Sequence, residues 1–162
     1  MTGESEIRRQ VLELLRGGNA HMSFDDAVAS FPTESMNALI PHCTYTPWHL
    51  IEHMRLTQLD ILEFITDPKY RDRAWPDDYW PARDATATPA QWQETVDGFH
   101  RDLATLQRMV EDPTLDLNAP IPHGSGQTPL REFLLVADHI AYHIGEFAIL
   151  RQVTGTWPAD HR

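Results

Sequence analysis

The sequence predicts an all-α protein, an up-and-down four-helix bundle formed by one domain over residues 1–162. Three long segments begin with the same Thr-Pro signal and keep the apolar spacing of helices that bury one face. The alternating Val, Ile and Thr runs that a sheet needs are absent from the sequence. A chain of this length can bury roughly two-thirds of its unfolded surface in one core.

The first helix is predicted over about residues 4–15, where a Gly-Gly pair ends it. A short helical continuation is expected in SFDDAVASF. There Ser23 would accept a hydrogen bond from a free backbone N–H, and the two aspartates that follow suit the positive end of a helix. A proline-rich stretch over 32–41 separates this part from the long helices.

The three long helices are predicted over about residues 47–66, 89–110 and 129–153. Their start signals are Thr46-Pro47, Thr88-Pro89 and Thr128-Pro129. In each, the threonine oxygen can accept an unpaired backbone N–H, and proline suits the first helical position because its missing N–H would be unpaired anyway. Gln91 would complete a capping box. The expected ends are at Asp67-Pro68, Asp112-Pro113 and Gly155.

Charge and composition exclude several classes of function. Thirteen basic and 24 acidic residues give a net charge of −11, and this field repels nucleic acid and anionic membranes. The one cysteine, Cys43, allows no intramolecular disulfide. The N-terminal residues MTGESEIRRQ lack the features of a signal peptide, and no run approaches 18 uninterrupted apolar residues. We therefore expect a cytoplasmic protein that binds neither nucleic acid nor membrane.

Two connections are unusually long for a compact domain. Residues 67–88 contain Trp75, Tyr79 and Trp80. These aromatic side chains could pack as a lid over one end of the bundle, or they could fill a groove between helices. The second connection, 111–128, carries His123 among prolines and glycines. A histidine in such a loop is usually solvated, so His123 is a weak candidate for catalysis.

Two His-x-x-x-His pairs stand inside predicted helices: His49/His53 in WHLIEH and His139/His143 in DHIAYH. Nine histidines in this chain would give about 0.5 such pairs by chance. Residues four apart share one face of a helix, so the two side chains of a pair can converge on one ion. The alternative is that these histidines are hydrogen-bonded residues at the edge of the core.

Helix phasing separates the two histidines of the first pair. His53 lies roughly 95° from the centre of the apolar stripe and His49 roughly 135° from it. We therefore expect His53 to point into the bundle and His49 to face solvent. His139 and His143 lie on one flank of the apolar face of the last helix, with His143 closer to the core. The predicted set is His53, His139 and His143.

Three neutral imidazoles suit Zn²⁺, Ni²⁺, Cu²⁺ or Fe²⁺. Three protein ligands leave one position open for water or substrate, which is typical of a catalytic site rather than a structural one. An ion there would lower the pKa of a bound water or thiol toward neutral and so create a nucleophile.

Four stretches of the sequence carry a resemblance to a known family. They are TPWHLIEH, the tryptophan-rich AWPDDYWP, PIPHGSGQTPLRE and DHIAYHIGEF. They lie between residues 46 and 147, and with them the chain resembles the DinB/YfiT-like proteins, four-helix bundles regarded as metal-dependent enzymes. In that family a histidine of the helix that corresponds to residues 47–66 and an HxxxH pair of the last helix bind a divalent metal. The resemblance thus implies that His53, His139 and His143 are the ligands.

The resemblance implies a class of chemistry rather than one reaction. Members of the family include bacillithiol S-transferases and a mycothiol-dependent maleylpyruvate isomerase, in which the metal is assigned the activation of a small thiol. For this chain it implies a metal-dependent S-transferase that uses a low-molecular-weight thiol, or a hydrolase, with a small-molecule substrate. The expected cofactor is a divalent transition metal, Zn²⁺ or Ni²⁺ first, although three imidazoles bind most first-row ions.

Several further side chains have competing interpretations. Glu146 shares a face with His139 and His143, so it could be a fourth ligand, a hydrogen-bond acceptor behind a ligand or a general base; a solvated glutamate is the alternative. Glu52 is expected to be a surface charge. Tyr142 could donate a hydrogen bond, although a tyrosine on a helix more often serves in packing. The remaining residues weighed for a role are expected to be a spectator thiol and two arginines on solvated helix faces: Cys43, Arg131 and Arg151.

The rival classes lack their sequence signals. A di-iron bundle needs Glu-x-x-His pairs, a zinc protease needs His-Glu-x-x-His, and a serine hydrolase of the α/β type needs Gly-x-Ser-x-Gly. The alternative that stays open is a non-catalytic binding or interaction bundle whose metal is structural or absent. An enzyme should have a solvent-open pocket over the metal, lined by the 67–88 and 111–128 connections. The oligomeric state is also open, and a homodimer that pairs through apolar helix faces is one expectation.

Overall fold

The computed structural model describes residues 3–161, and the regular structure in this range is helical. The helices are α1 (Gly3–Arg16), α2 (Phe24–Val28), α3 (Pro47–Thr66), α4 (Pro89–Glu111) and α5 (Pro129–Thr154), with a short 3₁₀ helix at Thr33–Ser35. The predicted all-α class is confirmed. The bounds of the four long helices agree with the predicted ones to within one residue.

Threonine caps begin the three longest helices, as the sequence predicts. The side chains of Thr46, Thr88 and Thr128 each accept a hydrogen bond from the backbone N–H three residues further on. Gln91 completes the predicted capping box of α4. At the other end of α5, Gly155 adopts a left-handed conformation with φ of 65°, which favours glycine.

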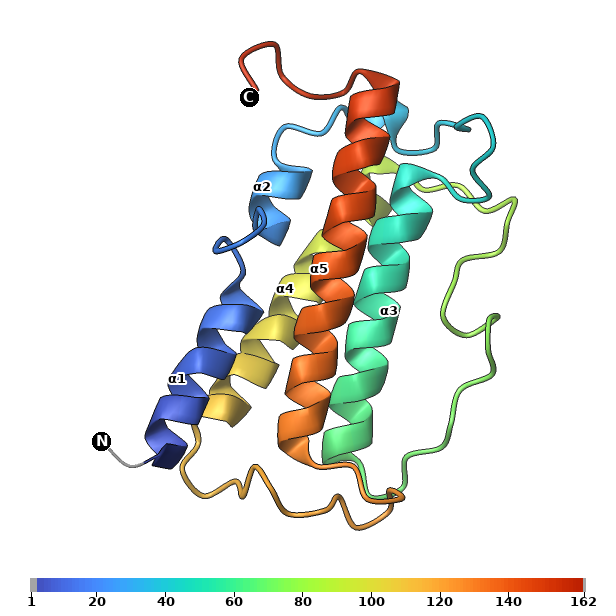
Figure 1. Cartoon of the computed structure of the whole chain (residues 1–162). Helices are drawn as coiled ribbons and strands as arrows, with labels where there is room; N and C mark the ends of the chain where they lie inside the picture. Colours follow the sequence, from blue (N-terminus) through green and yellow to red (C-terminus); the bar gives the residue numbers. More distant parts are fainter. Residues whose placement is uncertain (1–2, 162) are drawn as a thin grey trace.

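Each of the helices α1, α3, α4 and α5 packs against two of the other three. α3 contacts α4 and α5, α1 contacts the same two helices, and the short α2 lies against α5 (Figure 1). The space between them is filled by apolar side chains with no more than 1% of their surface exposed. They include Leu50, Met54, Phe99, Leu106, Phe133 and Phe147. Burial of these side chains supplies the main driving force for association of the helices.

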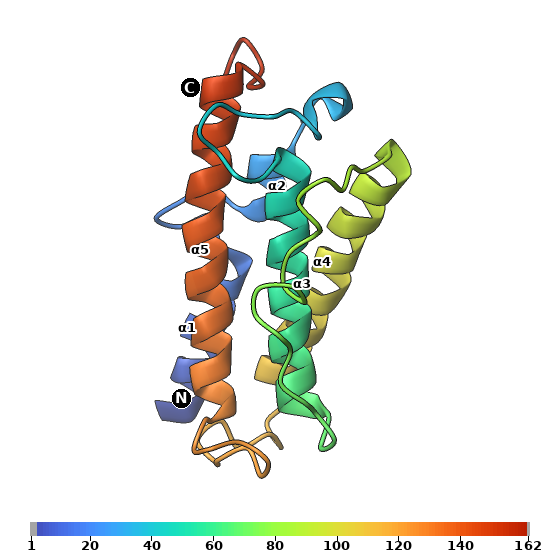
Figure 2. The same cartoon turned by 90° about the vertical axis from the view of Figure 1, so that its right-hand side faces the viewer.

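The direction of the helices differs from the up-and-down prediction. α1 and α5 run one way, and α3 and α4 both run the other way, as Figure 1 and Figure 2 show. Residues 67–88 therefore return along the full length of α3 before α4 begins; we call this segment the crossover. A 20-residue helix is about 30 Å long, a distance that roughly nine extended residues span. The prediction was wrong because it considered this long connection only as a lid or as the filling of a groove, and not as a segment that returns along a helix.

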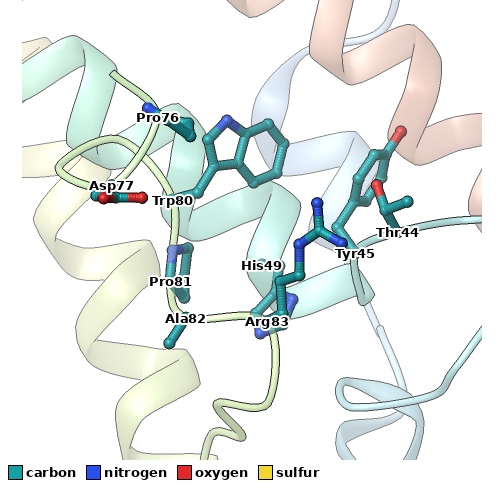
Figure 3. A pocket seen from close by; sticks show the side chains of 9 residues that line it. All are labelled: Thr44, Tyr45, His49, Pro76, Asp77, Trp80, Pro81, Ala82 and Arg83. Atoms are coloured by element: carbon teal, nitrogen blue, oxygen red, sulfur yellow. The ribbon is translucent and has the colours of Figure 1, made fainter. Parts of the chain in front are cut away.

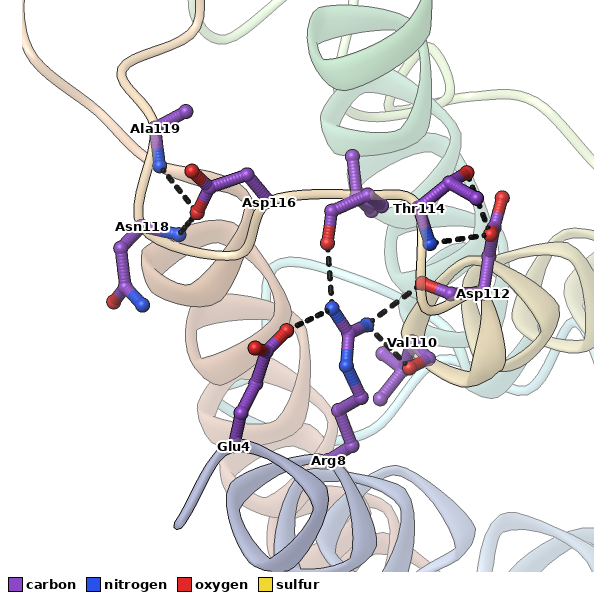
Figure 4. Close-up of polar contacts among 9 residues, drawn as sticks. Glu4, Arg8, Val110, Asp112, Thr114, Asp116, Asn118 and Ala119 are labelled. Atoms are coloured by element: carbon purple, nitrogen blue, oxygen red, sulfur yellow. Dashed lines mark hydrogen bonds and ion pairs between the residues drawn. The ribbon is translucent and has the colours of Figure 1, made fainter. Parts of the chain in front are cut away.

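A buried arginine, Arg8, ties the start of the chain to the end of α4. Its guanidinium donates hydrogen bonds to the carbonyls of Val110 and Asp112, each at 2.9 Å, and pairs with Glu4 at 2.6 Å (Figure 4). Carbonyls at the C-terminus of a helix carry partial negative charge and lack helical partners. Arg8 therefore closes the end of α4 and fixes the beginning of the 112–128 connection.

Arg151 has the same role at the end of α2. It is fully buried, and its guanidinium donates to the carbonyls of Ala27 at 2.7 Å and Ala29 at 2.8 Å. The guanidinium also lies 3.9 Å from the centre of the Trp157 ring. The expectation that Arg151 stands on a solvated helix face is therefore wrong: α2 covers that part of α5.

α5 combines a buried face with an exposed apolar face. By length and composition alone this helix could cross a membrane, and 39% of the relevant stretch is buried in the protein. The core helix of a soluble protein has the same properties. Its exposed apolar side chains are Leu134, Tyr142, Ile149 and Val153. The predicted pairing of two copies through such a face stays a prediction.

Candidate metal centre

Three histidines meet between α3 and α5. The Nε2 atom of His53 lies 3.2 Å from Nε2 of His139 and 3.2 Å from Nε2 of His143. One ring nitrogen from each of the three lies within 4.8 Å of the others. Two nitrogens bound to one tetrahedral zinc ion at about 2.0–2.1 Å stand about 3.3 Å apart. The three side chains could therefore bind one metal ion.

Hydrogen bonds behind two of the imidazoles fix their orientation. Nδ1 of His53 donates to the carbonyl of Tyr79 at 2.8 Å, and Nδ1 of His143 donates to the Glu146 carboxylate at 2.6 Å. With the proton on Nδ1, Nε2 of each neutral ring carries a lone pair. The two Nε2 atoms lie 3.2 Å apart, and neither carries a proton, so no hydrogen bond joins them. A cation bound by both lone pairs would remove their repulsion.

The cluster keeps its histidines neutral. Burial lowers the pKa of His53 from 6.5 to about 4, against the raising effect of its hydrogen bond to Tyr79. Burial, and then the neighbouring His143 and His53, lower the pKa of His139 to about 3. Burial also lowers the pKa of His143, although Glu146 opposes this shift. Neutral imidazole is the form that binds a metal, so at neutral pH the three side chains have the protonation state that metal binding requires.

The crossover covers the cluster. The indole of Trp80 stacks on the imidazole of His53, with ring centres 3.8 Å apart and planes 5° from parallel. A pocket of about 450 Å³ opens above the histidines. Besides the three of them it is lined by Thr57, Trp75, Tyr79, Trp80, Leu135, Asp138 and Tyr142. The crossover aromatics therefore form a lid along the side of α3, and not over one end of the bundle as expected (Figure 1).

A buried carboxylate anchors this lid. Asp60, 7% exposed, accepts hydrogen bonds from the hydroxyls of Tyr70 at 2.9 Å and Tyr79 at 2.8 Å. Arg73 of the crossover pairs with the same carboxylate at 3.1 Å. Asp60 stands seven residues after His53 and hence on the same side of α3. The same face of α3 thus carries His53 and Asp60. Asp60 binds the Tyr79 hydroxyl, and the backbone carbonyl of Tyr79 orients the His53 imidazole.

His49 does not face solvent, so that prediction is wrong. It is 2% exposed, and its Nδ1 accepts the backbone N–H of Thr46 at 3.4 Å. Its Nε2 donates to the carbonyl of Ala85 at 2.9 Å. Phasing placed His49 far from the apolar stripe of α3, but the crossover packs on that side and buries it. His49 therefore completes the cap of α3 and holds the crossover instead of joining the other histidines.

The two weak candidates for catalysis occupy different places. Glu146 is the hydrogen-bond acceptor behind His143, one of the roles predicted for it. His123 is exposed and its Nε2 bonds to the carbonyl of Phe64, near the end of α3. The 111–128 connection therefore contributes nothing to the lining of the pocket above the histidines, although it was expected to do so.

Glu52 is not the surface charge that was predicted. Its carboxylate is half-buried, pairs with Arg55 at 2.5 Å and accepts the hydroxyl of Thr95 at 2.7 Å. The cause is α4, which packs against this side of α3. Arg131 is exposed and pairs with Glu132, as a helix-surface charge would.

Sequence reasoning missed three contributions to the site. They are the stacking of Trp80, the backbone carbonyl of Tyr79 and the anchoring carboxylate of Asp60. The spacing of seven between His53 and Asp60 was a usable signal, because it places both on one face of α3. A backbone carbonyl has no signature in a sequence.

Comparison of this chain with protein-family models, with curated proteins and with solved structures finds no match. The resemblance to DinB/YfiT-like proteins therefore rests on the four sequence stretches alone.

Proposed function

We propose that this chain is a metal-dependent enzyme of the DinB/YfiT type, a four-helix bundle that binds a divalent transition metal through His53, His139 and His143. The reaction that it supports best is transfer of a small thiol to an electrophilic small molecule, with hydrolysis as the related possibility. The observation that carries the proposal is the convergence of three Nε2 atoms beneath a pocket of about 450 Å³.

The donor set fits a catalytic metal better than a structural one. Three imidazoles converge, and the nearby Glu146 carboxylate is engaged with Nδ1 of His143 and is thereby placed behind that ring. A structural zinc site is closed by four protein ligands, whereas a catalytic site keeps one position for water or substrate. This difference favours an enzyme over the alternative, a binding bundle with a structural metal.

A divalent ion bound here would lower the pKa of a water or thiol at its open position, so that the nucleophile exists at neutral pH. The residues of the chain do the rest. Tyr79 and Glu146 hold two ligands in place, and Trp80 excludes water from one side of His53. Asp138 lines the pocket beside His139, and we assign it the acceptance of the nucleophile's proton.

The first experiment measures metal content. Untagged protein, loaded with Zn²⁺ or Ni²⁺ and dialysed, should hold about one equivalent per chain by ICP mass spectrometry. His139→Ala should lose it with circular dichroism unchanged. His123→Ala is the matched control, because it removes a histidine outside the cluster and should retain the metal. No metal in the wild-type protein would contradict the proposal.

The second experiment measures chemistry. Metal-loaded protein is incubated with bacillithiol, mycothiol or glutathione and the fluorogenic acceptor monochlorobimane. In this reaction a sulfur–carbon bond forms, chloride leaves and the thiol proton passes to a base. Metal-dependent turnover that Asp138→Asn reduces at least tenfold is expected for general-base catalysis. Stoichiometric metal without turnover on thiols or ester substrates would instead favour the structural metal.

A further inference from the structure

A second pocket shares Trp80 with the metal pocket. Its volume is about 400 Å³, and the segment before α3 and the second half of the crossover form its walls (Figure 3). The lining residues are Thr44, Tyr45, His49, Pro76, Asp77, Trp80, Pro81, Ala82 and Arg83. Both ring nitrogens of His49 are already engaged with the backbone, so it offers only its ring.

Arg83 is the cation of this pocket. In Figure 3 its side chain extends toward Thr44 and Tyr45, at the end of the pocket away from Asp77. Within residues 3–161 the guanidinium has neither an ion pair nor a hydrogen bond, and the Thr44 hydroxyl also makes no hydrogen bond there. By contrast, Arg73 of the same crossover is paired with two carboxylates. In a chain with net charge −11, an arginine left without an acidic partner in a pocket is available to a ligand.

The body of the pocket is apolar and aromatic. The rings of Tyr45 and Trp80 lie 5.3 Å apart at 32° to each other, and Pro76 and Pro81 complete the wall. Such walls bind flat or apolar groups, while a few placed polar groups fix their orientation. A guanidinium recognises a carboxylate through two parallel hydrogen bonds.

We propose that this pocket binds a small organic carboxylate, whose carboxylate group pairs with Arg83 and whose aromatic or apolar body lies against Trp80. The inference deepens the proposed function and rests on it in one respect: the bound carboxylate is the recognition end of the substrate, and its reactive end reaches the metal pocket past the shared indole. The class of substrate is therefore an anionic small molecule with an unsaturated or aromatic body.

The test uses the full chain without metal, after dialysis against EDTA, so that a carboxylate cannot bind an ion instead. The probes are benzoate and benzamide, which match in shape and differ in charge. We expect saturable binding of benzoate by calorimetry, at least tenfold tighter than binding of benzamide. Arg83→Gln should weaken benzoate at least tenfold and leave benzamide unchanged. Arg71→Gln is the control, because Arg71 is an exposed crossover arginine outside the pocket.

Equal affinity of the wild-type protein and Arg83→Gln for benzoate, or loss of the same size in Arg71→Gln, would overturn the proposal. The outcome is separable from that of the proposed function. If the protein binds metal but its binding of benzoate does not depend on Arg83, the proposed carboxylate pocket is wrong and the proposed metal centre stands. Arg83-dependent binding in a protein that holds no metal would leave an anion-binding bundle.

Discussion

The two His-x-x-x-His pairs have the same spacing and serve different ends. On α5, His139 and His143 both join the cluster. On α3, only His53 does so, while His49 closes the helix cap and bonds to the carbonyl of Ala85. Both members of the α3 pair are buried, at 2% and 3% exposure, so burial does not separate them.

The neighbouring element separates them. Both histidines donate to a crossover carbonyl, but they differ at the other ring nitrogen. That of His53 lies against α5, where two more imidazoles stand, whereas that of His49 accepts the backbone N–H of Thr46. A four-residue spacing on a helix therefore predicts that two side chains share a side of the helix, and no more. What an imidazole does there depends on the groups that the fold places opposite it.

Metal content should differ most strongly between variants of the two α3 histidines. His53→Ala removes one of three ligands and should reduce bound metal from about one equivalent to less than about a tenth after dialysis. His49→Ala, four residues away on the same helix, should keep its equivalent. ICP mass spectrometry on both variants measures this. Equal metal content in the two variants would mean that the cluster is not the metal site.

The stability of the metal-free protein should depend more on His49 than on His139. His49→Ala should lower the free energy of unfolding by about 2 kcal/mol, because it removes the capping partner of Thr46 and leaves the Ala85 carbonyl without its donor. Urea denaturation in EDTA measures it. His139→Ala, the control, should change the metal-free stability by less than about 1 kcal/mol, because His139 is only half-buried. Equal losses would show that both pairs are structural.

The pH dependence of stability tests whether burial keeps the clustered histidines neutral. The folded-state pKa values of His53 and His139 are about 4 and about 3, below the ordinary 6.5. The unfolded chain thus binds more protons between pH 6.5 and about 4, and stability falls as the pH is lowered through that range. Allowing for solvent that still reaches the cluster, we expect the metal-free protein to lose about 1 kcal/mol between pH 7 and pH 5. Thermal melts of His139→Ala should show a smaller loss of stability between pH 7 and pH 5 than the wild-type protein. The same dependence of stability on pH in both proteins would contradict this expectation.

A smaller effect is expected at the acceptor behind His143. Glu146→Gln replaces a charged acceptor by a neutral one and should weaken zinc binding about tenfold, because such partners raise the basicity of a ligand. Competition against a chromogenic chelator measures the affinity. Glu34→Gln changes the same charge on an exposed residue far along the chain from the cluster. This variant should leave the affinity for zinc unchanged. A loss of affinity like that of Glu146→Gln would show that the effect comes from the net charge of the protein and not from the hydrogen bond to His143.

The hydrogen bonds that anchor the lid to Asp60 should have the weakest influence on zinc affinity. Tyr79→Phe and Tyr70→Phe each remove one hydroxyl from Asp60. Only Tyr79 also carries the carbonyl that orients His53, so its variant should weaken zinc binding about threefold while the other leaves it unchanged. The same chelator competition applies. Equal affinities in the two variants would show that the anchor does not position the ligand.

The sequence predicted the helices well because their signals are local. A Thr-Pro start needs only the threonine hydroxyl and the backbone N–H three residues on, and these form wherever the helix packs. The set of His53, His139 and His143 was also predictable, since phasing and the family resemblance selected the same residues. The fates of His49, Glu52 and Arg151 were not predictable, because each depends on an element far away in the sequence that covers it.

The sequence alone was enough to predict the helical class and the limits of the long helices. These depend on hydrogen bonds and on apolar spacing within about one or two helical turns. Only the tertiary structure decided that α3 and α4 run parallel, that the crossover returns over α3, and that Trp80, Tyr79 and Asp60 complete the site. The physical reason is that a side chain or carbonyl acquires its role from whatever stands opposite it. In this chain those partners come from segments that only the packing of the helices brings together.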